Sequence, residues 1–103
     1  MSTFVRVGSK KDFPEGRTTA VKANGVDISV AHAVGNFYAF NDECTHAAAM
    51  LSGSDIEEGN ISCPLHGAQF SVSTGKALTL PAVEPLKMYD VKVDGDDVFV
   101  NVG

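Results

Sequence analysis

The sequence predicts an all-β fold, an antiparallel sandwich or barrel, on the basis of three observations. Apolar and polar side chains alternate over several short segments, and this alternation is the period of a strand with one buried face. Turn-forming residues separate these segments at intervals of about 8–12 residues, as is typical of sandwiches and barrels. No segment keeps a 3.6-residue period, and residues 47–51 are the only candidate for a helical turn.

The N-terminal segments predict a strand, a loop and a hairpin. An apolar run at residues 4–7 predicts the first strand, and residues 10–16 are expected to form a loop because they contain a proline and a glycine. Alternation at residues 19–23 and again at residues 26–30 predicts two paired strands. Asn24-Gly25 between them is a two-residue hairpin turn in which both positions tolerate positive φ.

Three further strands complete the expected base of the fold. Gly35-Asn36 is expected to turn the chain into residues 37–40, where aromatic side chains fall on both faces, as in a strand buried on both sides. Residues 86–93 and 98–102 alternate around an acidic turn at residues 94–96 and predict a second hairpin.

The middle of the chain, residues 41–81, differs in composition from the rest. It is rich in glycine, serine and alanine and contains both cysteines and two of the three histidines. A chain of 103 residues has room for one compact domain. We therefore expect a single domain over residues 1–103. In it, residues 1–40 and 82–103 form the base, and residues 41–81 form an inserted subdomain of two hairpin loops.

Composition and charge exclude several classes of partner. The chain has 8 basic and 13 acidic residues and a net charge of −5, which argues against binding to nucleic-acid phosphates. No stretch approaches the roughly 20 apolar residues of a membrane span. Arg6, Lys10 and Lys11 interrupt any apolar run of a signal peptide, so we expect a cytoplasmic protein, and we expect it to be a monomer.

The two cysteines admit three interpretations. A disulfide and a pair of buried thiols are the simple ones, although a reducing cytoplasm disfavours the disulfide. A metal site competes with both because each cysteine is followed closely by a histidine. The two pairs are Cys44-Thr45-His46 and, after sixteen further residues, Cys63-Pro64-Leu65-His66.

This ligand set suits a pair of bridged irons. Thiolates are soft anionic ligands suited to ferric iron, whereas neutral imidazoles suit an iron that is reduced more readily. Each Cys-His pair can send one ligand to either metal. Replacing two thiolates by imidazoles also removes negative charge, so that adding an electron costs less energy.

With these motifs, the chain resembles the Rieske ferredoxin family, and most closely the soluble ferredoxin component of bacterial ring-hydroxylating dioxygenase systems. The resemblance implies one [2Fe–2S] cluster per chain, with Cys44 and Cys63 on one iron and His46 and His66 on the other. It also implies transfer of single electrons from an NAD(P)H-dependent flavin reductase to a terminal oxygenase. The matching stretches are Phe37-Tyr38-Ala39-Phe40, Cys44-Thr45-His46, Cys63-Pro64-Leu65-His66-Gly67, Phe70, Thr74-Gly75-Lys76 and Pro81, and Pro81 is expected to cover the cluster.

Four positions depart from the high-potential branch of that family, the Rieske proteins of respiratory complexes. Ala49 and Leu65 stand where that branch carries a disulfide between the ligand loops. Ala68 and Phe70 stand where it has a serine and a tyrosine that donate hydrogen bonds to sulfur. Fewer donors stabilise the reduced cluster less, so we expect a low-potential carrier.

Three alternatives to an electron carrier are weaker. A structural Cys2His2 zinc site usually pairs Cys with Cys and His with His, whereas each pair here is mixed. A Rieske oxygenase needs a second iron site, and only His32 is left for it; the alternation of its strand makes His32 a partly buried strand residue. The small subunit of an assimilatory nitrite reductase shares the fold but often lacks the ligands.

Overall fold

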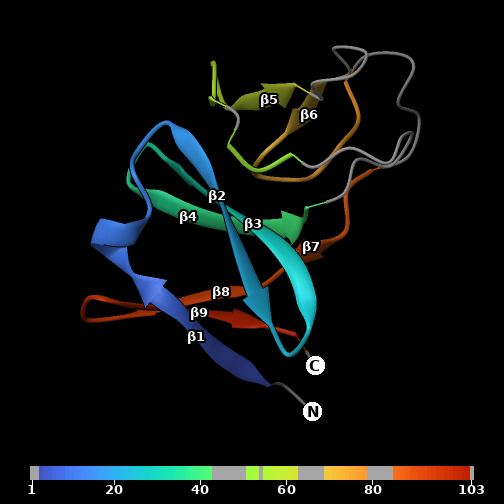
Figure 1. Cartoon of the computed structure of the whole chain (residues 1–103). Coiled ribbons are helices and arrows are strands. Elements are labelled where there is room, and N and C mark those ends of the chain that lie inside the picture. The colour runs from blue at the N-terminus through green and yellow to red at the C-terminus, as the bar shows by residue number, and fades with distance from the viewer. Residues whose placement is uncertain (1–2, 43–50, 54, 63–68, 79–84, 103) are drawn as a thin grey trace.

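A computed structural model of the chain describes residues 3–42, 51–53, 55–62, 69–78 and 85–102 (Figure 1). Within these ranges every strand pairing is antiparallel and there is no α-helix, which confirms the predicted all-β class. The elements are β1 (Phe4–Ser9), the 3-10 helix η1 (Lys10–Asp12), β2 (Arg17–Ala23), β3 (Val26–Ala33), β4 (Asn36–Asn41), β5 (Asn60–Ser62), β6 (Gln69–Ser71), β7 (Met88–Tyr89), β8 (Val91–Asp94) and β9 (Asp97–Asn101).

The strands form three antiparallel sheets stacked in layers. A four-stranded sheet of order β2-β3-β4-β7 lies between a three-stranded sheet of order β1-β9-β8 and the β5-β6 hairpin (Figure 1). The first two sheets are the predicted sandwich, and the hairpin covers the outer face of the four-stranded sheet.

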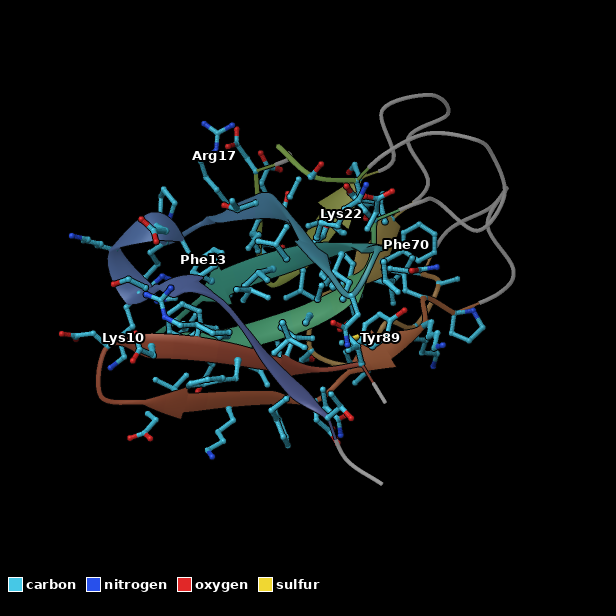
Figure 2. The ribbon with its side chains drawn as sticks, turned by 60° about the horizontal axis from the view of Figure 1, so that its bottom comes forward. Lys10, Phe13, Arg17, Lys22, Phe70 and Tyr89 are labelled. Atoms are coloured by element: carbon cyan, nitrogen blue, oxygen red, sulfur yellow. The ribbon has the colours of Figure 1, made fainter. Side chains whose placement is uncertain are left out.

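The central sheet is buried on both faces because its strands alternate apolar side chains between two hydrophobic cores. The base core lies between the two large sheets and contains Phe13, Ala23, Ile28, Val30, Ala39, Val98 and Val100. The subdomain core lies on the opposite face and contains Ala31, Ala33, Phe40, Leu51, Ile61, Phe70, Val72 and Leu86. Consecutive residues of β4, Ala39 and Phe40, therefore enter different cores, which confirms that residues 37–40 are buried on both sides. Figure 2 shows Phe13 near η1 and Phe70 beside β6.

Three expectations about local structure need correction. The loop over residues 10–16 contains η1, whose Asp12 carboxylate accepts a hydrogen bond from the Ser9 amide at 2.9 Å. The β3–β4 turn is Val34-Gly35 rather than Gly35-Asn36, since both turn residues have positive φ and Asn36 already pairs with Ala33. The segment over residues 86–93 is two strands, because the chain passes from one sheet to the other between β7 and β8.

The subdomain is bonded to the edge of the central sheet along β2. The amide of Gly53 donates to the carbonyl of Thr18 at 3.0 Å, and the amide of Ile56 donates to the carbonyl of Gly16 at 2.7 Å. The Arg17 guanidinium adds a hydrogen bond to the Gly53 carbonyl at 2.9 Å. β5 and β6 lie within residues 41–81, and the other described strands lie almost wholly outside that range.

Candidate metal centre

The candidate ligands lie in two segments outside the described residues, and the structure describes the residues that flank both segments. Most of the residues singled out in the sequence lie in these undescribed parts of the chain, as does most of the candidate helical turn at residues 47–51. They are Cys44, His46, Ala49, Cys63, Leu65, His66, Ala68 and Pro81. The flanking residues determine where each segment leaves the fold and returns to it.

The second ligand pair belongs to the connection of a hairpin. β5 ends at Ser62, directly before Cys63, and β6 begins at Gln69, directly after Ala68. Ser62 and Gln69 are paired antiparallel. Their neighbours Ile61 and Phe70 are 1% and 0% exposed, so the hairpin is fixed by burial against the central sheet.

The first ligand pair belongs to a segment whose two ends meet. β4 ends at Asn41, Asp42 follows, and the chain is described again from Leu51. The Leu51 amide donates to the Asp42 carbonyl at 2.7 Å, and Leu51 itself is fully buried. The segment therefore starts directly after an inner strand of the central sheet and ends at a buried residue that is bonded back to that start.

A third segment, residues 79–84, contains Pro81 and begins beside the β5–β6 hairpin. The Leu78 amide donates to the Gln69 carbonyl at 2.8 Å, and the Leu86 amide donates to the Gly75 carbonyl at 2.7 Å. Gly75 has a φ of +76°, and a Cβ at this position would lie 2.8 Å from the Leu86 carbonyl oxygen. Only glycine fits this close approach, so Gly75 fixes the far end of the segment.

His32 has a structural environment. Its Nδ1 lies 2.8 Å from the Phe13 carbonyl oxygen, and its ring stacks on Phe37 at a centroid distance of 4.2 Å. Its side chain is 18% exposed, which confirms the prediction of a partly buried strand histidine. Over the part of the chain that the structure describes, no three His, Cys, Asp or Glu side chains form a group that could hold a metal ion.

The donor set of the two segments fits a [2Fe–2S] cluster with mixed ligands. Two thiolates and two imidazoles are the ligands of a Rieske centre, and each Cys-His pair stands on a segment whose ends are fixed by backbone hydrogen bonds. Sequence reasoning missed Asp42, whereas Gly75 stands in one of the stretches that carry the family resemblance. The signal for Asp42 was a carboxylate directly after an apolar strand and two residues before Cys44.

Among the described residues, no helix is long and apolar enough to cross a membrane. The antiparallel base and the two anchored Cys-His segments together define an iron–sulfur protein. Residues 3–90 match the model of the Rieske [2Fe–2S] domain. The chain belongs to the Rieske [2Fe–2S] domain family, which confirms the predicted cluster and makes the zinc interpretation wrong.

Relatives and solved structures agree with this family. The chain is 42% identical over 92 residues to the 3-phenylpropionate/cinnamic acid dioxygenase ferredoxin subunit of Escherichia coli K12, covering 88% of this chain and 86% of that one. The ferredoxin of carbazole 1,9a-dioxygenase from Nocardioides aromaticivorans IC177 matches with a TM-score of 0.89 and 37% identity, over 95% of this chain and 96% of that chain.

A complex of reduced oxygenase and oxidised ferredoxin in carbazole 1,9a-dioxygenase contains a chain that matches with a TM-score of 0.88 and 32% identity, over 95% of this chain and 92% of that chain. An NADH-dependent nitrite reductase small subunit from Mycobacterium tuberculosis matches with a TM-score of 0.89 over 100% of this chain and 97% of that chain, but at 15% identity. That likeness shows the fold alone. The protein is an electron carrier of the dioxygenase-ferredoxin type rather than a catalytic oxygenase.

Proposed function

We propose that this protein accepts single electrons from an NAD(P)H-dependent flavin reductase and delivers them to a terminal Rieske oxygenase. The observation that carries the proposal is a complete set of two Cys-His pairs in a chain that matches dioxygenase ferredoxins over most of its length. A solved structure with a similar chain is a complex of oxygenase and ferredoxin in carbazole 1,9a-dioxygenase, which supports the same kind of partner here.

We assign Cys44 and Cys63 to one iron and His46 and His66 to the other. When bound, the cluster takes up and releases one electron without a change of ligands. The two segments that carry the proposed ligands are bonded at both ends, the second by the Ser62–Gln69 pair and the first by the Leu51 amide, which donates to the Asp42 carbonyl. Ends held in this way favour a site that changes little between redox states, so that little energy is lost in rearranging the protein.

Buried apolar side chains lie next to the points at which the ligand segments rejoin the described chain. Leu51 and Phe70 are fully buried in the subdomain core, and they lie at the return of the first and second ligand segments. Apolar packing of this kind strengthens the hydrogen bonds and charges that act on the site.

Four finer properties complete the proposal. The carrier has a low reduction potential, because Ala68 and Phe70 supply no hydroxyl donor to sulfur. Residues 41–81 form the cluster-binding subdomain of a single domain. The protein acts as a monomer, and it acts in the cytoplasm, where NAD(P)H is available to the reductase.

Reconstitution tests this function directly. We expect the purified protein to be brown and to contain two irons per chain. We expect it to support substrate hydroxylation when added to a dioxygenase-type reductase and oxygenase pair. A brown protein that is reduced by the flavin reductase but never reoxidised by any ring-hydroxylating oxygenase would contradict the proposed partner. A colourless zinc-containing protein would contradict the iron–sulfur cluster itself.

A further inference from the structure

A buried carboxylate stands between the central sheet and the first ligand segment. Asp42 is 2% exposed. Its Oδ1 accepts hydrogen bonds from the Ser52 amide at 2.7 Å, from the Leu51 amide at 3.1 Å and from the Ser29 hydroxyl at 2.7 Å. Its Oδ2 accepts a fourth bond, from the Ser52 hydroxyl at 3.0 Å. The carboxylate thus joins β3 to Leu51 and Ser52, the residues that follow the first ligand segment.

Burial of the Asp42 carboxylate lowers the stability of the fold unless all of its hydrogen-bond donors are in place. Burying a carboxylate costs several kcal/mol when it is unpaired. The donors bonded to Asp42 in the described part of the chain are neutral amides and hydroxyls rather than cations. A negative charge is therefore held in the interior by neutral donors, where charged groups act over longer distances than in water.

The position of Asp42 connects this network to the ligands. Cys44 follows Asp42 by two positions, and two steps of chain span at most about 7 Å. The Asp42 amide donates to the Asp27 carbonyl at 3.2 Å, and the Thr18 hydroxyl donates to the Leu51 carbonyl at 3.1 Å. The residues on the two sides of the segment are therefore bonded to neighbouring strands of the central sheet, Asp42 to β3 and Leu51 to β2, and Asp42 joins the beginning of the segment to its end.

We propose that Asp42 is a positioning residue for Cys44 and His46, which holds the two ends of residues 43–50 together and sets a fixed negative charge beside them. The inference rests on the ligand assignment made above. Closing the segment at a carboxylate reduces the conformations open to its ligands before iron binds. The same charge opposes the addition of an electron and lowers the midpoint potential.

Two variants separate the two effects. Asp42→Ala removes all four hydrogen bonds and the charge. We expect it to lose its cluster to a chelator about 10- to 100-fold faster than the native protein, as is usual when an outer partner of a metal ligand is removed. Asp42→Asn removes the charge but keeps one carbonyl oxygen for the donors on Oδ1. We expect it to lose its cluster more slowly than Asp42→Ala and to have a higher midpoint potential than the native protein.

Two control variants match these changes. Val98→Ala opens a cavity in the base core, on the other face of the central sheet, and we expect no change in midpoint or electron paramagnetic resonance spectrum. Asp27→Asn removes an exposed carboxylate that pairs with Lys22 at 3.7 Å. We expect its midpoint to stay close to the native value, because solvent screens an exposed charge.

A third measurement does not depend on the cluster. In cluster-free protein, the amides of Leu51 and Ser52 should exchange with deuterium faster in Asp42→Ala than in the native chain, while amides of β9 keep their rates. If Asp42→Ala does not fold, Ser29→Ala and Ser52→Ala each remove one donor, and we expect faster cluster loss in both than in Val98→Ala.

The proposal is overturned if the folded Asp42 variants, or the serine variants in their place, lose iron no faster than Val98→Ala. It is also overturned if Asp42→Asn has the native midpoint. Cys44→Ala tests the ligand assignment separately. A Cys44→Ala protein that keeps the Rieske spectrum would refute the assignment itself. If Cys44→Ala is bleached while the Asp42 variants keep the native rate of cluster loss and the native midpoint, the positioning role alone is refuted.

Discussion

At the scale of single residues, the three histidines differ in what surrounds their rings. The His32 ring has one nitrogen within hydrogen-bond distance of the Phe13 carbonyl oxygen, and one of its faces stacks on Phe37. His46 and His66 each follow a cysteine closely in a segment between packed strands. Residue type alone does not distinguish these roles, but the spacing to cysteine does.

The first prediction tests this distinction. On the proposed assignment, His46→Ala and His66→Ala would each remove a ligand from the histidine-bound iron, so we expect both to abolish the Rieske visible and electron paramagnetic resonance spectra. His32→Ala should keep both spectra and lose about 0.5–1.5 kcal/mol of stability from the lost ring stacking. A protein bleached by His32→Ala but not by His66→Ala would contradict the ligand set.

The second prediction concerns the midpoint potential. Rieske centres span about −150 to +300 mV, and we expect the native midpoint near the low end. Ala68→Ser and Phe70→Tyr together should raise it, since each adds a hydroxyl that can donate to sulfur. The measurement is a redox titration followed by circular dichroism.

Phe40→Tyr is the control for that pair of substitutions. Phe40 and Phe70 are both fully buried in the subdomain core, so each variant adds a hydroxyl to the same apolar region. An added hydroxyl without a partner costs about 1–3 kcal/mol of stability. We expect the Phe40→Tyr midpoint to stay at the native value. A native midpoint above zero would contradict the assignment to the dioxygenase branch.

At the scale of elements, the two hairpins of the central sheet use the same turn with different residues. Asn24-Gly25 and Val34-Gly35 all have positive φ. Asparagine and glycine favour this conformation, whereas a β-branched residue is a clear outlier there. Val34 is 87% exposed, so no buried contact of its side chain offsets the strain.

The third prediction follows from this turn. Val34→Asn should raise the free energy of unfolding by about 1 kcal/mol, because the left-handed conformation costs an ordinary residue about 1–2 kcal/mol. A domain of this size then melts about 4–8 °C higher. Asn24→Val makes the opposite change in the matching turn and should lower the melting temperature. Equal melting temperatures for all three proteins would show that neither turn is strained.

The same elements show how far the sequence predicts the fold. Strict alternation along β2, β3 and β9 made these strands predictable, and so did the Asn24-Gly25 turn. The Val34 turn was displaced by one residue in the prediction because valine carries no local signal for positive φ. Asp42 was missed as an anchor because its place after an apolar strand indicates at most a buried carboxylate, whereas its partners Ser29 and Ser52 are 13 and 10 residues away in sequence.

At the scale of the whole molecule, the charge is unbalanced. The net charge of −5 is large for 103 residues. A field of this sign accelerates encounter with a basic surface on a partner and is screened over about 10 Å at 0.1 M salt.

The fourth prediction concerns encounter with the reductase. Electron-transfer rates measured by stopped flow should fall as ionic strength rises from about 0.01 to 0.5 M, since screening weakens the attraction between the proteins. Sodium chloride and potassium sulfate at matched ionic strength should give the same decrease, which separates screening from binding of a particular ion. Rates that do not change with salt would leave the acidic surface as a source of solubility only.

The closed ends of the three inserted segments have an evolutionary consequence. Backbone hydrogen bonds fix where each segment leaves and rejoins the fold, at Asp42 and Leu51, at Ser62 and Gln69, and near Leu78 and Leu86. The described residues of the central sheet and of both cores lie outside these segments, and loop length adds little to the cost of closure. We therefore expect changes of sequence or length between these points to leave the scaffold in place. Selection on partner recognition and selection on stability therefore act on separate residues. A lineage of such proteins can exchange one redox partner for another while its scaffold stays the same.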